Sequence, residues 1–180
     1  MYRLVHALTP ADRPRLLAHF KALDENDRWL RFSANLPDDM LADYVDGIDF
    51  ERDLVFGAFN VAFELVAVAH VGIREGTAEI GLSVLVGYRR EGLARRLIER
   101  ARRSAVARGC HRLWIHFMRD NDAMASLTRS LGMESRAAHG ECDAYLALPQ
   151  ASPLALRFAL CETQVDSLLG ALRHWVPHAA

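Results

Sequence analysis

The chain has 180 residues, 51% of them hydrophobic and 25% charged, which suits one globular domain with a substantial core and room for a terminal extension. Its net charge of −1 excludes a general electrostatic attraction to nucleic acid or to an anionic membrane. Three widely separated cysteines argue against a disulfide framework and favour a cytoplasmic location, and no apolar stretch is long enough to span a bilayer.

The first fifty residues predict one short strand followed by three helices. Residues 2–8 are expected to form the strand. Thr9-Pro10 then predicts a helix start, because threonine is a favoured N-cap and proline suits the first helical position. Two further short helices are expected at 24–32 and 37–45.

From Asp53 onward the pattern changes to strands. Runs rich in Val, Phe and Ala predict strands at 54–59 and 65–73, and a turn at Glu75-Gly76 leads to a third strand at 79–86. A helix at 93–108 follows, because apolar residues recur there at helical spacing and a glycine comes directly after it.

The rest of the chain predicts a strand at 111–118, a helix whose apolar stripe is Met124, Leu127 and Leu131, and two strands between 133 and 148. Residues 1–149 are therefore expected to form one α+β, three-layer domain with a mixed sheet. This architecture follows from the early helices, the antiparallel meander and the one later crossover. Residues 150–180 are expected to form a helical extension that covers the sheet or builds a homodimer. Its apolar stripe is Val165, Leu168, Leu169, Leu172 and Trp175.

The most informative stretch is the six residues Arg89 to Ala94, between an expected strand and an expected helix. Backbone N–H groups at a helix start lack internal partners, and the helix dipole adds partial positive charge. Small residues at Gly92 and Ala94 let a ligand approach that backbone. The stretch therefore predicts a phosphate or pyrophosphate site, to which Arg89, Arg90 and Arg95 can add charge-assisted hydrogen bonds.

The charge distribution agrees with a local anion site. Residues 87–112 hold nine Arg against two acids, a net charge of +7, whereas residues 1–54 hold eleven acids against seven bases. A nucleic-acid site is the alternative for this Arg-rich segment, but such a site would also want lysines, and the segment has none. No nucleic acid, membrane or metal partner is expected.

The loop resembles the Gln/Arg-x-x-Gly-x-Gly/Ala loop of the GNAT superfamily of N-acetyltransferases. Asn121, Leu127 and Leu131-Gly132-Met133 resemble that superfamily's next helix, with Thr128 where a tyrosine is usual. The resemblance implies a mostly antiparallel sheet flanked by helices, with acetyl-CoA as co-substrate. It implies that Leu82 and Val84 hold the pantetheine arm, that the loop residues Arg89, Arg90, Gly92, Leu93, Ala94 and Arg95 bind the diphosphate, and that Asn121 contacts the far end of the arm.

A further resemblance concerns the acceptor side. The strand Ala78-Glu79-Ile80-Gly81-Leu82-Ser83-Val84 resembles that of bacterial Pat-type protein lysine acetyltransferases, in which the matching glutamate is taken as the general base. Residues 24–32 resemble the helix that lines the acceptor side in the same enzymes. The resemblance thus implies Glu79 as the catalytic base of direct acetyl transfer to a primary amine.

The identity of the acceptor stays open at this point. A protein lysine is one candidate, and a polyamine, an aminoglycoside or an amino acid is another. Thr128 is a weaker and shorter acid than tyrosine, so what protonates the leaving thiolate is also open, and a catalytically weak acyl-CoA-binding sensor or regulatory module is the alternative function. The protein is expected to be a monomer or a homodimer.

Overall fold

The computed structural model describes residues 4–153, 156–157, 159, 161–162, 164–166, 168 and 170. The first strand, β1 (Val5–Ala7), leads through a 3-10 turn at Pro10–Asp12 into three helices, as the sequence predicts. Thr9 opens the turn, where its backbone N–H and its hydroxyl both donate to the Asp12 carboxylate, at 3.0 and 3.2 Å. The helices are α1 (Arg13–Lys21), α2 (Glu25–Phe32) and α3 (Asp38–Asp46).

A meander of three strands follows, and two helices alternate with the remaining strands. The meander is β2 (Leu54–Phe59), β3 (Leu65–Arg74) and β4 (Thr77–Val84), and it ends in a 3-10 turn at Val86–Tyr88. Then come α4 (Leu93–Ala107), β5 (Arg112–Met118), α5 (Asp122–Ser130), β6 (Glu134–Ala138) and β7 (Glu141–Ala147). The strand expected at 79–86 thus begins and ends two residues earlier than predicted, and the chain turns after Val84.

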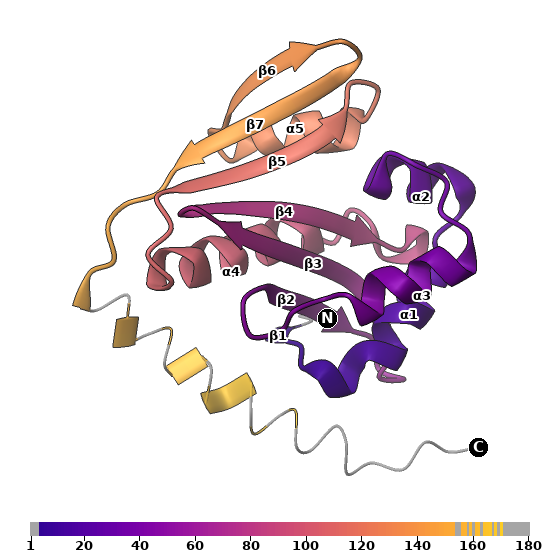
Figure 1. The fold of residues 1–180 in the computed structure, drawn as a ribbon, viewed down its shortest axis with the longest axis horizontal. Helices are drawn as coiled ribbons and strands as arrows, with labels where there is room; N and C mark the ends of the chain where they lie inside the picture. Colours follow the sequence, from indigo (N-terminus) through magenta and orange to yellow (C-terminus); the bar gives the residue numbers. More distant parts are fainter. Residues whose placement is uncertain are drawn as a thin grey trace.

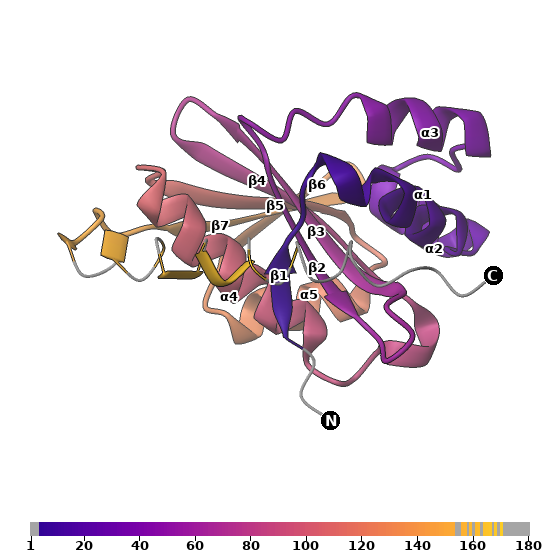
Figure 2. The same cartoon turned by 90° about the horizontal axis from the view of Figure 1, so that it is seen from below.

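The seven strands form one sheet in the order β1-β2-β3-β4-β5-β7-β6. Only β4 and β5 are parallel neighbours; the other neighbours are antiparallel. Helices α1, α2 and α3 cover one face of the sheet, and α4 and α5 cover the other (Figures 1 and 2). The predicted three-layer α+β fold with a mixed, mostly antiparallel sheet is therefore confirmed.

Each face of the sheet has its own apolar core. The face toward α4 packs around Leu93, Leu97, Ile98, Ala101 and Ala105, which the sequence predicts as the inner side of that helix. The opposite face packs against residues of α1 and α3, among them Leu16, Phe20, Leu41 and Val45. Strand side chains alternate between these two cores, so consecutive residues of β4 serve different layers.

The tail meets the domain through charged groups. Arg100 of α4 is 6% exposed and pairs with Asp166 at 2.6 Å and with Glu162. Val165 and Leu168, two members of the predicted apolar stripe, are exposed, whereas Leu169, Leu172 and Trp175 lie outside the described residues. The described part of the tail therefore contacts the domain by its acidic side chains, which the predicted stripe does not anticipate.

Candidate active site

A cleft opens where β4 and β5 separate. These parallel strands are paired only from Thr77 with Arg112 to Glu79 with Trp114. Beyond Glu79 the two strands diverge (Figure 1). The Leu85 N–H donates to the Val66 carbonyl and therefore points toward β3. Backbone groups of successive residues point to alternate sides of a strand, so the N–H and C=O groups of Leu82 and Val84 point away from β3, toward the opening. Backbone groups of Leu82 and the N–H of Val84 are thus available along one wall of the cleft, whereas the Val84 carbonyl already accepts from Arg89.

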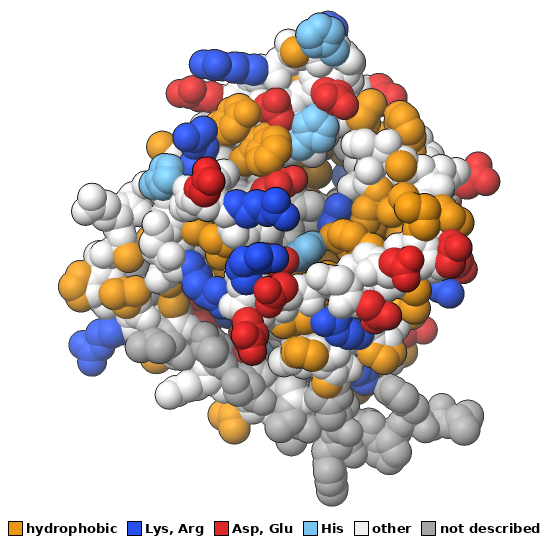
Figure 3. All heavy atoms as spheres, viewed as in Figure 1, with side chains coloured by type: hydrophobic (Ala, Val, Ile, Leu, Met, Phe, Trp, Pro, Cys, Tyr) orange, Lys and Arg blue, Asp and Glu red, His pale blue; other side chains and the backbone are white. Residues whose placement is uncertain are grey.

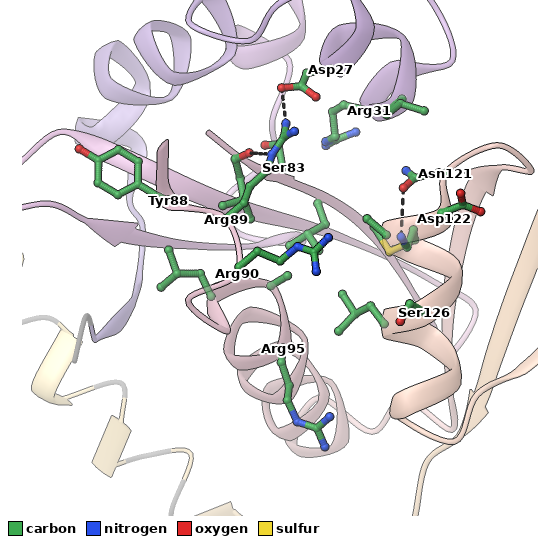
Figure 4. A pocket seen from close by; sticks show the side chains of 18 of the residues that line it. Asp27, Arg31, Ser83, Tyr88, Arg89, Arg90, Arg95, Asn121, Asp122 and Ser126 are labelled. Carbon is green, nitrogen blue, oxygen red and sulfur yellow. Dashed lines mark hydrogen bonds and ion pairs between the residues drawn. The ribbon is translucent and has the colours of Figure 1, made fainter. Parts of the chain in front are cut away.

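The cleft has a volume of about 660 Å³ and is bounded by β4, the loop before α4, and helices α2, α4 and α5. It brings together all nine residues predicted to bind the cofactor: Leu82, Val84, Arg89, Arg90, Gly92, Leu93, Ala94, Arg95 and Asn121. It also contains residues that were not predicted, including Asp27 and Arg31 of α2 and Ser126 of α5 (Figure 4).

The start of α4 has the backbone geometry of an anion site. Gly92 has a φ of +76°, and Arg90, with a φ of +65°, is also left-handed. The first helical hydrogen bond is from the Arg96 N–H to the Gly92 carbonyl, so the preceding amides of the first turn are not used inside the helix. A Cβ at Gly92 would meet no protein atom within 4 Å, which leaves space for a ligand beside this backbone.

The three arginines at the cleft have different partners. Arg89 donates to the Val84 carbonyl at 3.1 Å and pairs with Asp27, so its guanidinium ties β4 to α2. Arg95 bonds Glu99 at 3.1 Å and Ser130 at 3.3 Å. Arg90 extends into the cavity toward α5 (Figure 4). Of the three, Arg90 is the one for which the structure records no partner among the residues it describes.

Helix α5 forms the far wall. Asn121 is its N-cap and accepts the Met124 N–H at 3.0 Å. Thr128, at the position where the resemblance expects tyrosine, is fully buried. Its hydroxyl donates to the carbonyls of Met124 and Ala125 within the same helix and does not line the cleft. The threonine hydroxyl is therefore not presented to a ligand in the cleft.

Glu79 lies outside the cleft lining, on the opposite side of β4 from the α4 core. It is exposed and borders a separate groove with Gly72, Arg74, Arg112 and Trp114. Glu79, Gly81 and Ser83 share one face of β4 because strand residues alternate. This face, which we call the acceptor face, is the one covered by α1 and α2 and is the side seen in Figure 3, where basic and acidic side chains gather over the sheet.

A buried histidine supports the cleft wall from behind. His19 of α1 lies 2.8 Å from the Leu65 carbonyl and 2.8 Å from the Ser83 hydroxyl. Burial lowers the pKa of His19 from 6.5 to about 4. The hydrogen bond to Leu65 opposes this lowering, and the positive charge of Arg31 adds to it. His19 is thus neutral at pH 7. Because a carbonyl only accepts, its Nδ1–H donates to Leu65 and its Nε2 accepts the Ser83 O–H.

A second polar chain crosses the acceptor face. Arg31 donates to the Tyr44 hydroxyl at 2.8 Å, the hydroxyl lies 2.6 Å from His70 Nδ1, and His70 Nε2 lies 3.1 Å from Asp53. Desolvation lowers the pKa of His70, with a further lowering by the charge of Arg31, although Asp53 opposes it. His70 is thus held between Tyr44 and Asp53, and through Tyr44 it is linked to Arg31.

A third group lies on β5 and β7. His116 Nδ1 is 3.0 Å from Asp143, which also accepts the Trp114 indole N–H at 2.8 Å. Desolvation raises the pKa of Asp143, but the hydrogen bonds from His116 and Trp114 and the charge of His116 outweigh it and leave the pKa below its usual value. Because a carboxylate only accepts, His116 donates from Nδ1 to Asp143, and its Nε2 lies 3.8 Å from the Glu141 carboxylate. Sequence reasoning missed this pair because its members are 27 residues apart.

Within the described part of the chain, no cluster of three or more His, Cys, Asp or Glu side chains could hold a metal ion. Among the same residues, no helix combines the length and the apolar character needed to cross a membrane.

Comparison with known proteins identifies the family. A profile of the acetyltransferase (GNAT) family matches residues 23–133, which include α2, the β4 strand, the loop and α5. The chain belongs to this family. Its members use acetyl-CoA as co-substrate for N-acetylation, so the chain is an N-acetyltransferase by family. A search of curated proteins found no match.

Solved structures agree with this assignment at the level of the fold. The GNAT domain of PAT from S. lividans is similar, with a TM-score of 0.70 and 20% identity over 81% of this chain and 90% of that one. Ribosomal-protein-alanine N-acetyltransferase from Brucella melitensis has a TM-score of 0.66 and 22% identity over 81% and 99% of the two chains. The ribosomal-protein-S18-alanine N-acetyltransferase from Escherichia coli has a TM-score of 0.62 and 20% identity over 84% and 96%.

Proposed function

We propose that this protein transfers an acetyl group directly from acetyl-CoA to a primary amine, with Glu79 as the general base. The observation that carries the proposal is that Glu79 is the last residue of β4 that pairs with β5, where the β4–β5 opening begins. Its carboxylate is exposed on the acceptor face, on the opposite side of the strand from the α4 core.

The residues of the cleft fit the co-substrate. The free amides at the start of α4 and the guanidinium of Arg90 suit a diphosphate, and the backbone groups of Leu82 and Val84 that face the opening suit an amide-containing arm. Acetyl-CoA supplies the acetyl group as a thioester, which an amine can attack. Arg89 holds α2 against β4 through Asp27 and so keeps the cleft walls together.

The amine must lose a proton before it can attack, because an alkylammonium group has a pKa near ~10.4. A carboxylate at the edge of the opening can accept that proton directly or through one water. The His116–Asp143 pair lies on the same face of the sheet and is the second candidate for the base, because imidazole is a common general base. Glu79 is the proposed base because β4 and β5 begin to separate at this residue.

Two acceptor classes remain in competition. The resemblance of residues 24–32 and of the Glu79 strand to protein lysine acetyltransferases, and the similar fold of S. lividans PAT, support a protein lysine. The acidic first 54 residues and a site open to solvent support a small amine.

A binding module without turnover is the second candidate function. The buried hydroxyl of Thr128, which is committed to its own helix, favours it, because it removes the acid that many small-molecule members use toward the leaving thiolate. Tight coenzyme A binding without coenzyme A release over a broad amine panel would support this alternative.

The test of the base is Glu79→Gln, compared with His116→Gln. We incubate each protein with acetyl-CoA and pooled amines or lysine peptides, and measure free coenzyme A and acetyl-lysine. Glu79→Gln should lower turnover about 100-fold or more while the affinity for coenzyme A stays within about twofold, because general-base catalysis contributes about 10²–10⁴ in rate. His116→Gln should change turnover less than about tenfold. Unchanged turnover in Glu79→Gln, with a large loss in His116→Gln, would transfer the role to His116.

A further inference from the structure

Arg31 of α2 extends over the middle of β4 and into the cleft (Figure 4). A Cβ built on Gly81 would lie 2.4 to 2.5 Å from the Cζ and both Nη atoms of Arg31, so the guanidinium lies directly against the backbone of β4 at this glycine. Gly81 is two residues from Glu79 on the same face of the strand. The guanidinium is therefore placed beside the opening between the proposed base and the cleft.

Three aromatic rings and one hydroxyl fix the orientation of this guanidinium. Its Cζ lies 4.7 Å from the ring centroid of Phe32, 5.6 Å from that of Tyr44 and 5.8 Å from that of Phe20. Nη2 donates to the Tyr44 hydroxyl at 2.8 Å, and that hydroxyl is itself held by His70. The side chain is thus held in one position before any ligand arrives.

The charge of Arg31 is not compensated by the protein. Its Nε is buried with no hydrogen-bond partner, and the structure records no acidic partner for Arg31 among the residues it describes. The nearest acidic residue of the same helix turn, Asp27, is paired with Arg89 instead. Stacking on aromatic rings stabilises a cation only in part, and a partly buried cation without a counter-charge is costly. An anionic group of a ligand would supply the missing partner.

We infer that Arg31 binds a carboxylate of the acceptor, so that the acceptors are amines that also carry a carboxylate, as amino acids and short ω-amino acids do. The inference rests on the proposed function and narrows its acceptor class. A carboxylate matches the planar fork of a guanidinium, and a carboxylate bound to this guanidinium beside β4 would place the attached amine near the Glu79 end of the strand. Arg31 is a binding residue in this scheme and takes no part in proton transfer.

The experiment uses matched pairs of acceptors that differ in one charge. Glycine, 4-aminobutyrate and 6-aminohexanoate are each compared with their carboxamides as acetyl acceptors, by coenzyme A release, for the wild type, Arg31→Gln and Arg31→Lys. The wild type should prefer the carboxylate of at least one pair by about 10- to 100-fold in kcat/KM. Arg31→Gln should abolish the preference through KM, because it should lower kcat/KM for the carboxylates about 10- to 100-fold more than for the carboxamides. Arg31→Lys should restore part of the preference, because lysine keeps the positive charge but lacks the planar guanidinium that pairs with a carboxylate.

Several results would overturn the inference. Preference for the carboxamides, or an equal loss of rate on both members of a pair in Arg31→Gln, would make the arginine a structural residue. An Arg31-dependent preference for succinyl-CoA over acetyl-CoA would place the carboxylate on the acyl group instead of the acceptor.

The proposed function can fail separately. If no amine releases coenzyme A, calorimetry with 6-aminohexanoate and its carboxamide decides the inference alone. Binding of the carboxylate that disappears in Arg31→Gln supports it, and equal or undetectable binding of both compounds overturns it. Turnover without a carboxylate preference would leave the transferase proposal intact and remove this inference.

Discussion

Gly81 gives Arg31 its place because it has no side chain. A methyl group at Gly81 would overlap the Arg31 guanidinium and force it out of its contacts with Tyr44 and the aromatic rings. Gly81→Ala should therefore lower the free energy of unfolding by about 1 kcal/mol, the typical value of one lost hydrogen bond, and abolish the carboxylate preference as Arg31→Gln does. The measurement is the kcat/KM ratio for the carboxylate and carboxamide pairs. Gly87→Ala, where an added Cβ meets nothing within 4 Å, is the matched control and should keep the wild-type ratio. An equal kcat/KM ratio of carboxylate to carboxamide in Gly81→Ala and Gly87→Ala would contradict this placement of Arg31.

The sequence predicted some of these residues well and others not at all. The φ of Gly92 follows from a local pattern of a glycine between a strand and a helix, so the loop was predictable from adjacent residues. The role of Arg31 depends on Gly81, fifty residues away, and on aromatic rings from α1 and α3. No local spacing carries that information. The same reason applies to the His116–Asp143 pair, which forms only when β5 and β7 become neighbours.

Between α1 and the sheet, His19 links the stability of the fold to pH. Its pKa in the folded protein is about 4, against 6.5 when exposed, so the unfolded chain takes up a proton first as the pH falls. The contribution of neutral, buried His19 to the free energy of unfolding is therefore complete above pH 6.5 and is lost as the pH falls from 6.5 toward 4. Between pH 7 and pH 5 this amounts to about 2 kcal/mol. Denaturant unfolding at both pH values measures it.

The control for this pH dependence is a pair of histidine variants. His19→Gln should be less stable than the wild type at pH 7 but should lose less free energy of unfolding between pH 7 and pH 5. His111→Gln, which changes an exposed histidine, should behave as the wild type. An unchanged pH dependence in His19→Gln would assign the effect to another group.

For the molecule as a whole, the tail is attached to the domain by a buried ion pair. Arg100 is 6% exposed and Asp166 is 9% exposed, and Arg100 also lies over the ring of Phe56. Removing Asp166 leaves the buried Arg100 with Glu162 as its remaining acidic partner, so Asp166→Asn should lower the free energy of unfolding by about 1 to 2 kcal/mol. Glu99→Gln breaks the exposed pair with Arg95 and should cost less than about 0.5 kcal/mol. Equal effects in denaturant melts would show that the tail contributes little to the stability of the domain.

The layered fold was predictable at this scale, because helical and strand periodicities are strong in every element from α1 to β7. The manner of tail attachment was not predictable. The apolar stripe predicted a hydrophobic contact, whereas the described tail residues contact α4 through Glu162 and Asp166. The separation of residues 1–149 and 150–180 into a domain and an extension stays a prediction.

The proposed function requires that coenzyme A bind at the start of α4. Calorimetry with coenzyme A tests this binding most directly. The wild type should bind one coenzyme A per chain, Glu79→Gln should bind it equally well, and Gly92→Ala should bind it at least about tenfold more weakly. Gly109→Ala is the matched control, because Gly109 has a φ of +78° close to the +76° of Gly92 and equally free surroundings, but lies at the other end of α4. Both alanines should cost about 1 kcal/mol of stability, since both force a left-handed conformation. Absence of coenzyme A binding in the wild type, or equal affinity in the two alanine variants, would contradict the account.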